Sequence, residues 1–311
     1  MHYVPSKLRV CGFVALLCAL LSCQVEEETS TMRPGGSAYD CDEIDLLFVV
    51  DNSCSMYDEQ TALGQSFASF ISTIESELDT PEYHIMVVDS DDGPSSGCWD
   101  YCAKYDVDEC YGYSCDALGA YPSGCDATLG AGVIAPPASE CGLDAERRFM
   151  TKNTSDLSET FSCAANVGIL GQGEERMMQA MTTAVSDGLT GTDDCNAAFL
   201  RDDALLLVTF LTDEPDENST GNPTTWRQAL IDAKGGVEEA IVVLGLFGDN
   251  DEEDALCEDP TEGDYSGAYA APLLQEFVDS FHLQGLSGSI CEESYDSFFS
   301  DAVALLDAHC G

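Results

Sequence analysis

Two segments of the chain place oxygen-bearing side chains directly after an apolar run. The segment LLFVVDNSCSM ends its apolar run at Asp51 and then carries Ser53 and Ser55 at alternate positions. The segment ALLLVTFLTDE ends in the same way, at Asp213. Carboxylates and hydroxyls are oxygen ligands of the kind that hard divalent cations such as Mg²⁺ prefer. The two segments are therefore candidates for the halves of one metal site.

The four side chains can meet only if the two runs are neighbouring strands. Both runs have the composition of strands that are buried on both faces of a parallel sheet. Ligands of open α/β sheets bind beyond the carboxyl ends of the strands, which is where Asp51 and Asp213 stand. Alternate residues of one tight turn can direct Ser53 and Ser55 at the same ion. We therefore predict a metal site with few carboxylates and an open position for the carboxylate of a partner.

Simpler roles for these residues stay open. Asp51 and the two serines are also suited to capping the helix that follows them, and Asp213 is suited to a turn. Glu214 and Asp216 follow Asp213 in an acidic segment, where they either support the metal site or are solvated loop residues. Because thiolate is a poor ligand for hard ions, we expect Cys54 to be in a disulfide or to be a buried free thiol.

The elements that would position this site alternate between strands and helices. Strands are expected at 44–51, 83–89, 147–151, 204–214 and 240–249. Helices are expected around the repeat Leu63, Phe67, Phe70, Ile71 and Ile74, and at 155–166, 173–187, 225–233, 271–281 and 294–308. This order predicts an α/β, doubly wound fold with a mostly parallel central sheet flanked by helices. Residues 90–146 interrupt the alternation and are expected to be a disulfide-rich insertion.

The charge of the chain excludes some partners. It has 11 Lys and Arg residues against 58 Asp and Glu residues, a formal net charge of −47. Such a surface repels nucleic acid and anionic membranes and attracts cations. Most of the carboxylates need no other role than keeping the protein soluble. The acidic run at 249–264 is a candidate calcium site, although Asp254 stands where an EF-hand loop has glycine.

The first 40 residues read as a targeting segment and a tether. Lys7 and Arg9 precede the apolar stretch VCGFVALLCALLSC, which is too short to span a bilayer and resembles a secretion signal. Its end, LLSC, resembles a bacterial lipobox, in which Cys23 would carry the lipid. We expect a signal peptide at 1–22 and a flexible tether at 23–40, so the protein would be exported and anchored in the cell envelope, at the outer membrane or cell surface. A plain signal peptide is the alternative.

Export to an oxidising compartment accounts for the cysteines. The chain has 16 cysteines, of which two lie in the predicted signal and one is Cys23. Six cluster in the insertion, at Cys98, Cys102, Cys110, Cys115, Cys125 and Cys141. We interpret these as disulfides, with a zinc site as the weaker alternative. Because 13 cysteines remain after the signal and Cys23, we expect at least one to be free or paired with another chain.

The motifs VVDNSCSM and LLLVTFLTDE together resemble the von Willebrand factor type A (VWA) domain with its metal-ion-dependent adhesion site. The resemblance runs from about Asp42 to Cys310 outside the insertion, and implies a Rossmann-like VWA domain at 41–311. It implies that Asp51, Ser53, Ser55 and Asp213 hold Mg²⁺, or Mn²⁺ or Ca²⁺. DNSCSMYDEQ, GQGEE and TDEPDE resemble a subgroup of bacterial lipoproteins of this type.

One loop departs from that family pattern. The family usually supplies a threonine after the glycines of its third loop, and the equivalent stretch GILGQGEERMMQA has none. Glu174, Glu175 or water would take that position.

The function that this resemblance implies is binding of a partner protein through its carboxylate. The membrane would be contacted only through the lipid, and no nucleic acid would be bound. The sequence has no G-x-S-x-G, P-loop or H-E-x-x-H motif, so we do not expect an enzyme. A metal-assisted hydrolase and a passive acidic surface protein are the alternatives.

Overall fold

The computed structural model describes most of the chain after the predicted tether. The described residues are 42–78, 82–92, 97–105, 107–110, 113–118, 122–136, 139–144, 146–171, 175–252, 255–260 and 267–310. The predicted signal segment, Cys23 and Glu174 lie outside these ranges. None of the helices within them is long and apolar enough to cross a membrane.

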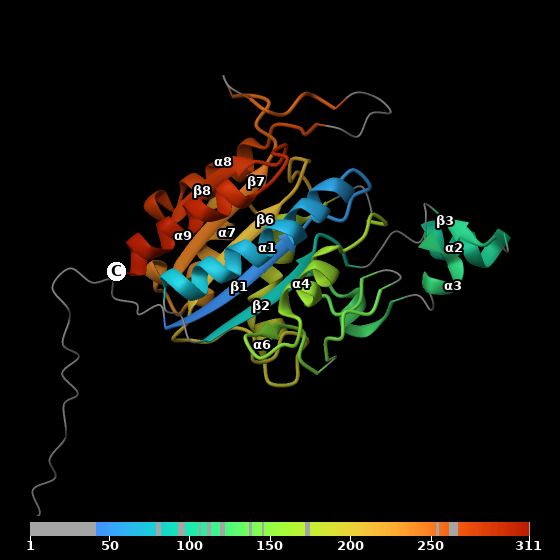
Figure 1. Cartoon of the computed structure of the whole chain (residues 1–311), viewed down its shortest axis with the longest axis horizontal. Helices are drawn as coiled ribbons and strands as arrows, with labels where there is room; N and C mark the ends of the chain where they lie inside the picture. Colours follow the sequence, from blue (N-terminus) through green and yellow to red (C-terminus); the bar gives the residue numbers. More distant parts are fainter. Residues whose placement is uncertain are drawn as a thin grey trace, which may run out of the picture. The chain divides into compact units, whose positions relative to one another are not determined.

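A six-stranded sheet forms the centre of the protein, in the order β5-β2-β1-β6-β7-β8 (Figure 1). Its strands are β1 Glu43–Val50, β2 Glu82–Asp89, β5 Met150–Thr151, β6 Leu205–Leu211, β7 Ile241–Phe247 and β8 Gly285–Ser289. All pairings are parallel except that of β5, which runs antiparallel to β2. The mixed α/β class and the mostly parallel sheet are therefore confirmed.

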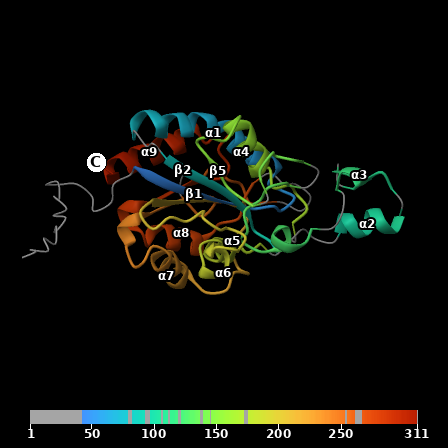
Figure 2. The ribbon, with the colours of Figure 1, turned by 90° about the horizontal axis from the view of Figure 1, so that it is seen from below.

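The sheet is covered by helices on both faces, as Figure 2 shows. The face that carries Leu46, Phe48 and Val50 packs against α1, α4 and α9. The opposite face, with Leu47 and Val49, packs against α5, α7 and α8. These helices are α1 Tyr57–Glu77, α4 Leu157–Ala165, α5 Met177–Ala184, α6 Asp187–Thr190, α7 Pro223–Ala233, α8 Pro272–Asp279 and α9 Asp296–Cys310. Burial on both faces explains why the central strands read as unbroken apolar runs.

The helix after the first turn illustrates how the sequence pattern builds a layer. All five apolar positions that predicted it, from Leu63 to Ile74, are buried in one core cluster. The short predicted helix at 225–233 begins slightly earlier, because Asn222 and Thr225 form a reciprocal cap and Pro223 occupies its first turn. It ends at Ala233, two residues before Gly235 and Gly236, which both have positive φ.

A buried ion pair closes the amino end of the sheet. Asp45 of β1 is fully buried, and its Oδ1 and Oδ2 accept hydrogen bonds from Arg201 Nε and Arg201 N, each at 2.7 Å. Lys234 Nζ donates to the carbonyl oxygen of Arg201 at 2.6 Å. These contacts lie at the edge of the sheet opposite to the predicted site.

The insertion contains two kinds of disulfide. Two bonds stay within it, Cys98–Cys110 and Cys102–Cys115, and connect α2 Gly97–Tyr105, the hairpin β3 Glu109–Cys110 and β4 Tyr113–Ser114, and α3 Cys115–Leu118. Two others, Cys125–Cys195 and Cys141–Cys163, join it to the main body. All six clustered cysteines are thus oxidised, and the zinc alternative is wrong. Cys257–Cys291 is a fifth bond.

The later part of the insertion is more integrated than the sequence suggested. Val133 N donates to Val87 O of β2 at 2.7 Å, and Leu129 is buried against the sheet. A short 3₁₀ helix, η1 Gly124–Ala127, precedes them. The sequence showed no periodicity here because these residues pack as irregular loops.

Candidate metal centre

The structure brings the four predicted ligand residues together at the carboxyl ends of β1 and β6. The two strands are neighbours, with Val50 opposite Leu211, and Asp51 N donates to Leu211 O at 3.1 Å. The Ser53 and Ser55 hydroxyl oxygens lie 3.1 Å apart, and both hydroxyls are close enough to the Asp213 carboxylate to favour its charged form. Their convergence makes a shared cation site geometrically possible, while their role as metal ligands stays a prediction.

The turn after β1 is held by its own polar groups. Asp51 Oδ1 accepts a hydrogen bond from Ser53 N at 2.7 Å. Helix α1 begins only at Tyr57, and no side chain caps it. The expectation that Asp51 and the serines serve only as a helix cap is therefore wrong.

Gln60 fixes this turn from within α1. It is 1% exposed, and its Nε2 donates to Asp51 O at 2.8 Å and to Gly168 O at 2.9 Å. Gly168 N donates back to Gln60 Oε1 at 3.3 Å. One amide thus connects the first and third loops of the site. Sequence reasoning missed it, although a polar residue on the buried side of an apolar helix is a usable signal.

Gly171 permits a close approach between the same two loops. Its N–H donates to Asn52 O at 2.9 Å, and a Cβ atom at this position would lie 2.0 Å from Asn52 Oδ1. A side chain of any kind would therefore displace the residue beside Asp51.

Thr212 supplies a further contact that the sequence analysis did not single out. Its hydroxyl donates to Asp51 Oδ2 at 2.6 Å, so both oxygens of Asp51 accept hydrogen bonds from the surrounding loops. The neighbouring Thr212 N–H is bonded to Leu246 O of β7 at 3.1 Å. Thr212 therefore orients Asp51 while its own backbone is fixed by the sheet.

Two buried carboxylates lie side by side in this centre. Asp51 is fully buried and Asp213 is 5% exposed. Burial, and then the Asp213 charge, raise the pKa of Asp51 to about 7, and burial raises the pKa of Asp213. Asp213 Oδ1 is buried and has no hydrogen-bond partner among the described residues. Such a pair is stabilised by a proton or by a cation.

The donor set fits a small hard cation. In the described part of the chain, no three His, Cys, Asp or Glu side chains form a metal-binding group. A cation here would consequently be held by the two carboxylates, the serine hydroxyls and water. Oxygen ligands with retained water are what Mg²⁺ prefers, whereas Zn²⁺ prefers nitrogen and sulfur.

Glu175 lies near Asp51 and hydrogen-bonds to Ser90 of the neighbouring loop. It is 2% exposed and hydrogen-bonds through Oε2 to the Ser90 hydroxyl. Burial, and then the charges of Asp51 and Asp91, raise its pKa to about 10, so it is protonated at neutral pH. Its carboxyl can therefore donate to Ser90, whose own hydroxyl then donates to Asn52 Oδ1 at 3.2 Å. Glu175 thus supports the Asn52 side of the turn as a neutral group.

The two acids after Asp213 have different surroundings. Glu214 is half-buried, and burial followed by the nearby Asp213 charge raises its pKa. Asp216 accepts from Met178 N at 2.7 Å and from Ser219 N at 2.9 Å. Its carboxylate is therefore engaged in capping the start of α5.

Cys54 lies between the two predicted serine ligands. It is the free cysteine of the described residues and its side chain is exposed. The expectation of a disulfide or a buried thiol is therefore wrong. The turn directs residues 53 and 55 toward Asp213, and this leaves Cys54 on the outer side.

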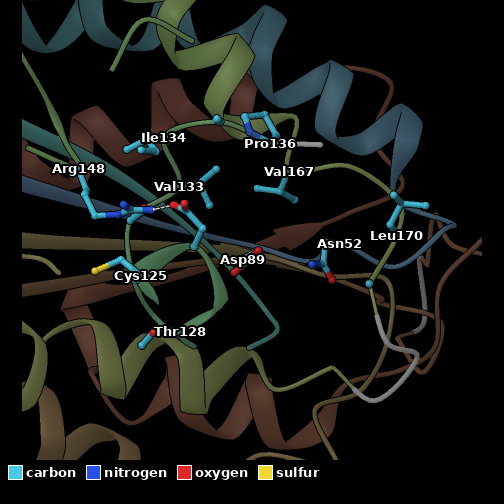
Figure 3. A pocket seen from close by; sticks show the side chains of 15 residues that line it. Asn52, Asp89, Cys125, Thr128, Val133, Ile134, Pro136, Arg148, Val167 and Leu170 are labelled. Carbon is cyan, nitrogen blue, oxygen red and sulfur yellow. Dashed lines mark hydrogen bonds and ion pairs between the residues drawn. The ribbon is translucent and has the colours of Figure 1, made fainter. Parts of the chain in front are cut away.

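A small cavity of about 50 Å³ lies beside the centre, at the carboxyl end of β2 (Figure 3). Asn52 and Asp89 line it, and the Arg148 guanidinium, which pairs with Asp126, lies in its wall. Burial, and then the Asp91 charge, raise the pKa of Asp89 to about 7. The cavity has room for a few water molecules.

Comparisons with known proteins add little to this geometry. No family model matches the chain, and no curated protein matches it. Among solved structures, it is similar to proximal thread matrix protein 1 from the mussel byssus, with a TM-score of 0.38 and 10% sequence identity. The match covers 88% of this chain and half of the mussel protein. Neither a fold family nor a function follows from a likeness at this level.

Proposed function

We propose that this chain is a VWA-type binding module that holds Mg²⁺ at Asp51, Ser53, Ser55 and Asp213 and uses it to bind a carboxylate of a partner protein. The observation that carries the proposal is the arrangement around Asp213. Both serine hydroxyls lie close enough to its carboxylate to favour the charged form, its Oδ1 is buried without a partner in the described chain, and its charge acts on Asp51. A divalent cation would neutralise both acids at once.

The charge of the donor set favours capture of an external anion. When bound, Mg²⁺ would supply a positive charge and an exchangeable water position. The two aspartates balance that charge, and the serines add neutral oxygens only. In the metal-free protein, burial and then the Asp51 charge raise the pKa of Glu175 to about 10, which favours its neutral form. Thr212 and Gln60 keep Asp51 and its turn in place, so that little rearrangement would be needed on binding.

The disulfides are consistent with an exported protein. We propose that the signal segment delivers the chain to the cell envelope and that a lipid on Cys23 anchors it there. The tether at 23–40 would let the binding face reach partners away from the membrane.

A titration with Mg²⁺ tests the proposed site. The purified protein is expected to gain about 2.7 kcal/mol of unfolding free energy when free Mg²⁺ is 100 times its Kd. Asp51→Ala should abolish this gain and the heat of Mg²⁺ binding in calorimetry. Asp203→Ala, which removes an exposed acid before β6, is the matched control and should behave like the wild type. An equal Mg²⁺ response in Asp51→Ala would refute the assignment.

The partner half of the proposal needs its own measurement. A protein retained from an envelope extract on immobilised wild type in Mg²⁺ should be released by EDTA and should not be retained by Asp51→Ala. Retention that survives EDTA would exclude a metal-bridged carboxylate.

A further inference from the structure

A second recess opens at the same edge of the sheet, beyond β7 and β8. It is a groove of about 620 Å³ whose lining includes the apolar residues Phe247, Ala271 and Pro272. The lining also includes five acids and, among its described residues, no Lys, Arg or His; the acids are Asp249, Asp251, Glu252, Glu276 and Asp279. The groove therefore combines apolar and strongly negative lining residues.

A short segment, residues 269–271, leads from the candidate metal centre to the groove. Strand β7 lies next to β6, and parallel strands place their carboxyl ends at one edge of the sheet. Asp213 O accepts a hydrogen bond from Tyr269 N at 2.9 Å, and Ala271, two residues further on, lines the groove. Tyr269 is 47% exposed, so an aromatic side chain is available close to this connection.

The acids of the groove have different roles but a common charge. Asp249 accepts hydrogen bonds from Leu256 N at 3.0 Å and Cys257 N at 2.9 Å, which orient it at the end of β7. Glu276 and Asp279 lie exposed on α8, four and seven residues after its first residue, Pro272. The Lys, Arg and His side chains that form ion pairs elsewhere in the described chain form none with these lining acids.

We propose that this groove binds a Lys or Arg side chain of the same partner segment whose carboxylate binds at the metal centre. The inference rests on the proposed function and specifies its partner. A partner with only acids near its binding carboxylate would be repelled by a chain of formal charge −47. A neighbouring basic side chain removes that repulsion, because its aliphatic stem can pack on the apolar lining residues and its charged head can pair with the acids.

The sheet geometry sets the spacing of the two groups in the partner. Neighbouring strands lie about 4.8 Å apart, so the ends of β7 and β8 lie roughly 5 to 10 Å from the end of β6. An extended segment covers about 3.3 to 3.6 Å per residue. The basic residue is thus expected two or three positions from the acid. Position two is favoured in an extended segment because alternate side chains point to the same side.

A random heptapeptide library displayed on phage tests both parts separately. It is selected on the immobilised full protein in Mg²⁺ and, in parallel, in EDTA. The groove variant is Glu276→Lys with Asp279→Lys, both on exposed positions of α8. The matched control is Asp301→Lys with Asp307→Lys, which makes the same charge change at exposed positions of α9.

We expect Asp or Glu to be enriched only in Mg²⁺, with Lys or Arg enriched two or three positions away. The groove variant should keep the acid and lose the basic residue, and the control should keep both. One selected peptide should bind the groove variant roughly fivefold to tenfold more weakly than the control at low salt. Acid enrichment without a basic residue, or a basic preference that survives in the groove variant, would overturn the inference. If no acid is enriched in a Mg²⁺-dependent way, the proposed function itself is refuted, and so is the inference that the partner carries both an acid and a basic residue.

Discussion

Replacement of Asp213 by Asn should make the metal-free protein more stable at pH 8. Burial and the Asp213 charge raise the pKa of Asp51 from 3.8 to about 7 in the folded state. A carboxyl group whose pKa is raised by folding binds its proton more tightly in the native state. Below about pH 4 the Asp51 carboxyl is protonated in both the folded and the unfolded chain and costs no stability. As pH rises from about 4 toward 7, the unfolded chain releases this proton first, and the free energy of unfolding falls.

The size of the effect follows from that shift. A change from 3.8 to about 7 corresponds to about 4 kcal/mol, at 1.36 kcal/mol per pKa unit. Burial is the larger cause and the Asp213 charge the second. Removing that charge should therefore recover less than half, roughly 1 to 2 kcal/mol. Asn has nearly the same shape as Asp and retains one side-chain oxygen beside the two serine hydroxyls, so little packing should be lost in exchange.

Urea unfolding in EDTA at pH 5 and pH 8 measures this difference. Relative to the wild type, Asp213→Asn should gain unfolding free energy at pH 8 and change little at pH 5, where Asp51 is protonated. Adding Mg²⁺ should reverse the order, because only the wild type gains a bound cation. Asp203→Asn, at an exposed position, should stay within about 0.5 kcal/mol of the wild type under all conditions. An equal loss of stability in Asp213→Asn at both pH values would refute the view that the two carboxylates oppose each other.

Two other substitutions test how the site and the sheet are held. Asp45→Ala should cost about 3 kcal/mol in urea unfolding, because it leaves the Arg201 guanidinium and N–H without their buried acceptor; a loss below 1 kcal/mol would mean that water replaces it. Gly171→Ala should cost about 1 to 3 kcal/mol and weaken Mg²⁺ binding in calorimetry, because its Cβ would overlap Asn52. Gly188→Ala, whose Cβ would meet nothing closer than 3.6 Å, is the control, and equal effects of the two changes would contradict this reasoning.

The sequence predicted best those elements that are buried on both sides. The central strands β1, β2, β6 and β7 are unbroken apolar runs because helices cover both faces of the sheet. Strand β8 was missed because its sequence, GLSGS, has one large apolar residue and lies at the sheet edge. Its role depends on pairing with β7, which no local pattern encodes.

The residues of the site that directly follow a strand could be predicted from the sequence. The residues that join the site through long-range contacts could not. Asp51 and Asp213 were found because each one ends an apolar run. The contact of Gln60 with Gly168 and the pairing of Cys125 with Cys195 join residues far apart in the chain. Such contacts depend on the folded arrangement, and cysteine spacing alone cannot specify connectivity.

The exposed thiol of Cys54 has a practical consequence for any measurement on this protein. It is flanked by Ser53 and Ser55, so a group attached to it would stand at the mouth of the candidate centre. In a dimer joined by a Cys54–Cys54 disulfide, each molecule would block access to the candidate metal centre of the other. A stored, air-oxidised sample would then bind fewer metal ions than it has protein molecules. The thiol should therefore be blocked with a small reagent, or kept reduced under conditions that spare the structural disulfides. Otherwise a measured binding stoichiometry can reflect oxidation during storage and not the properties of the protein.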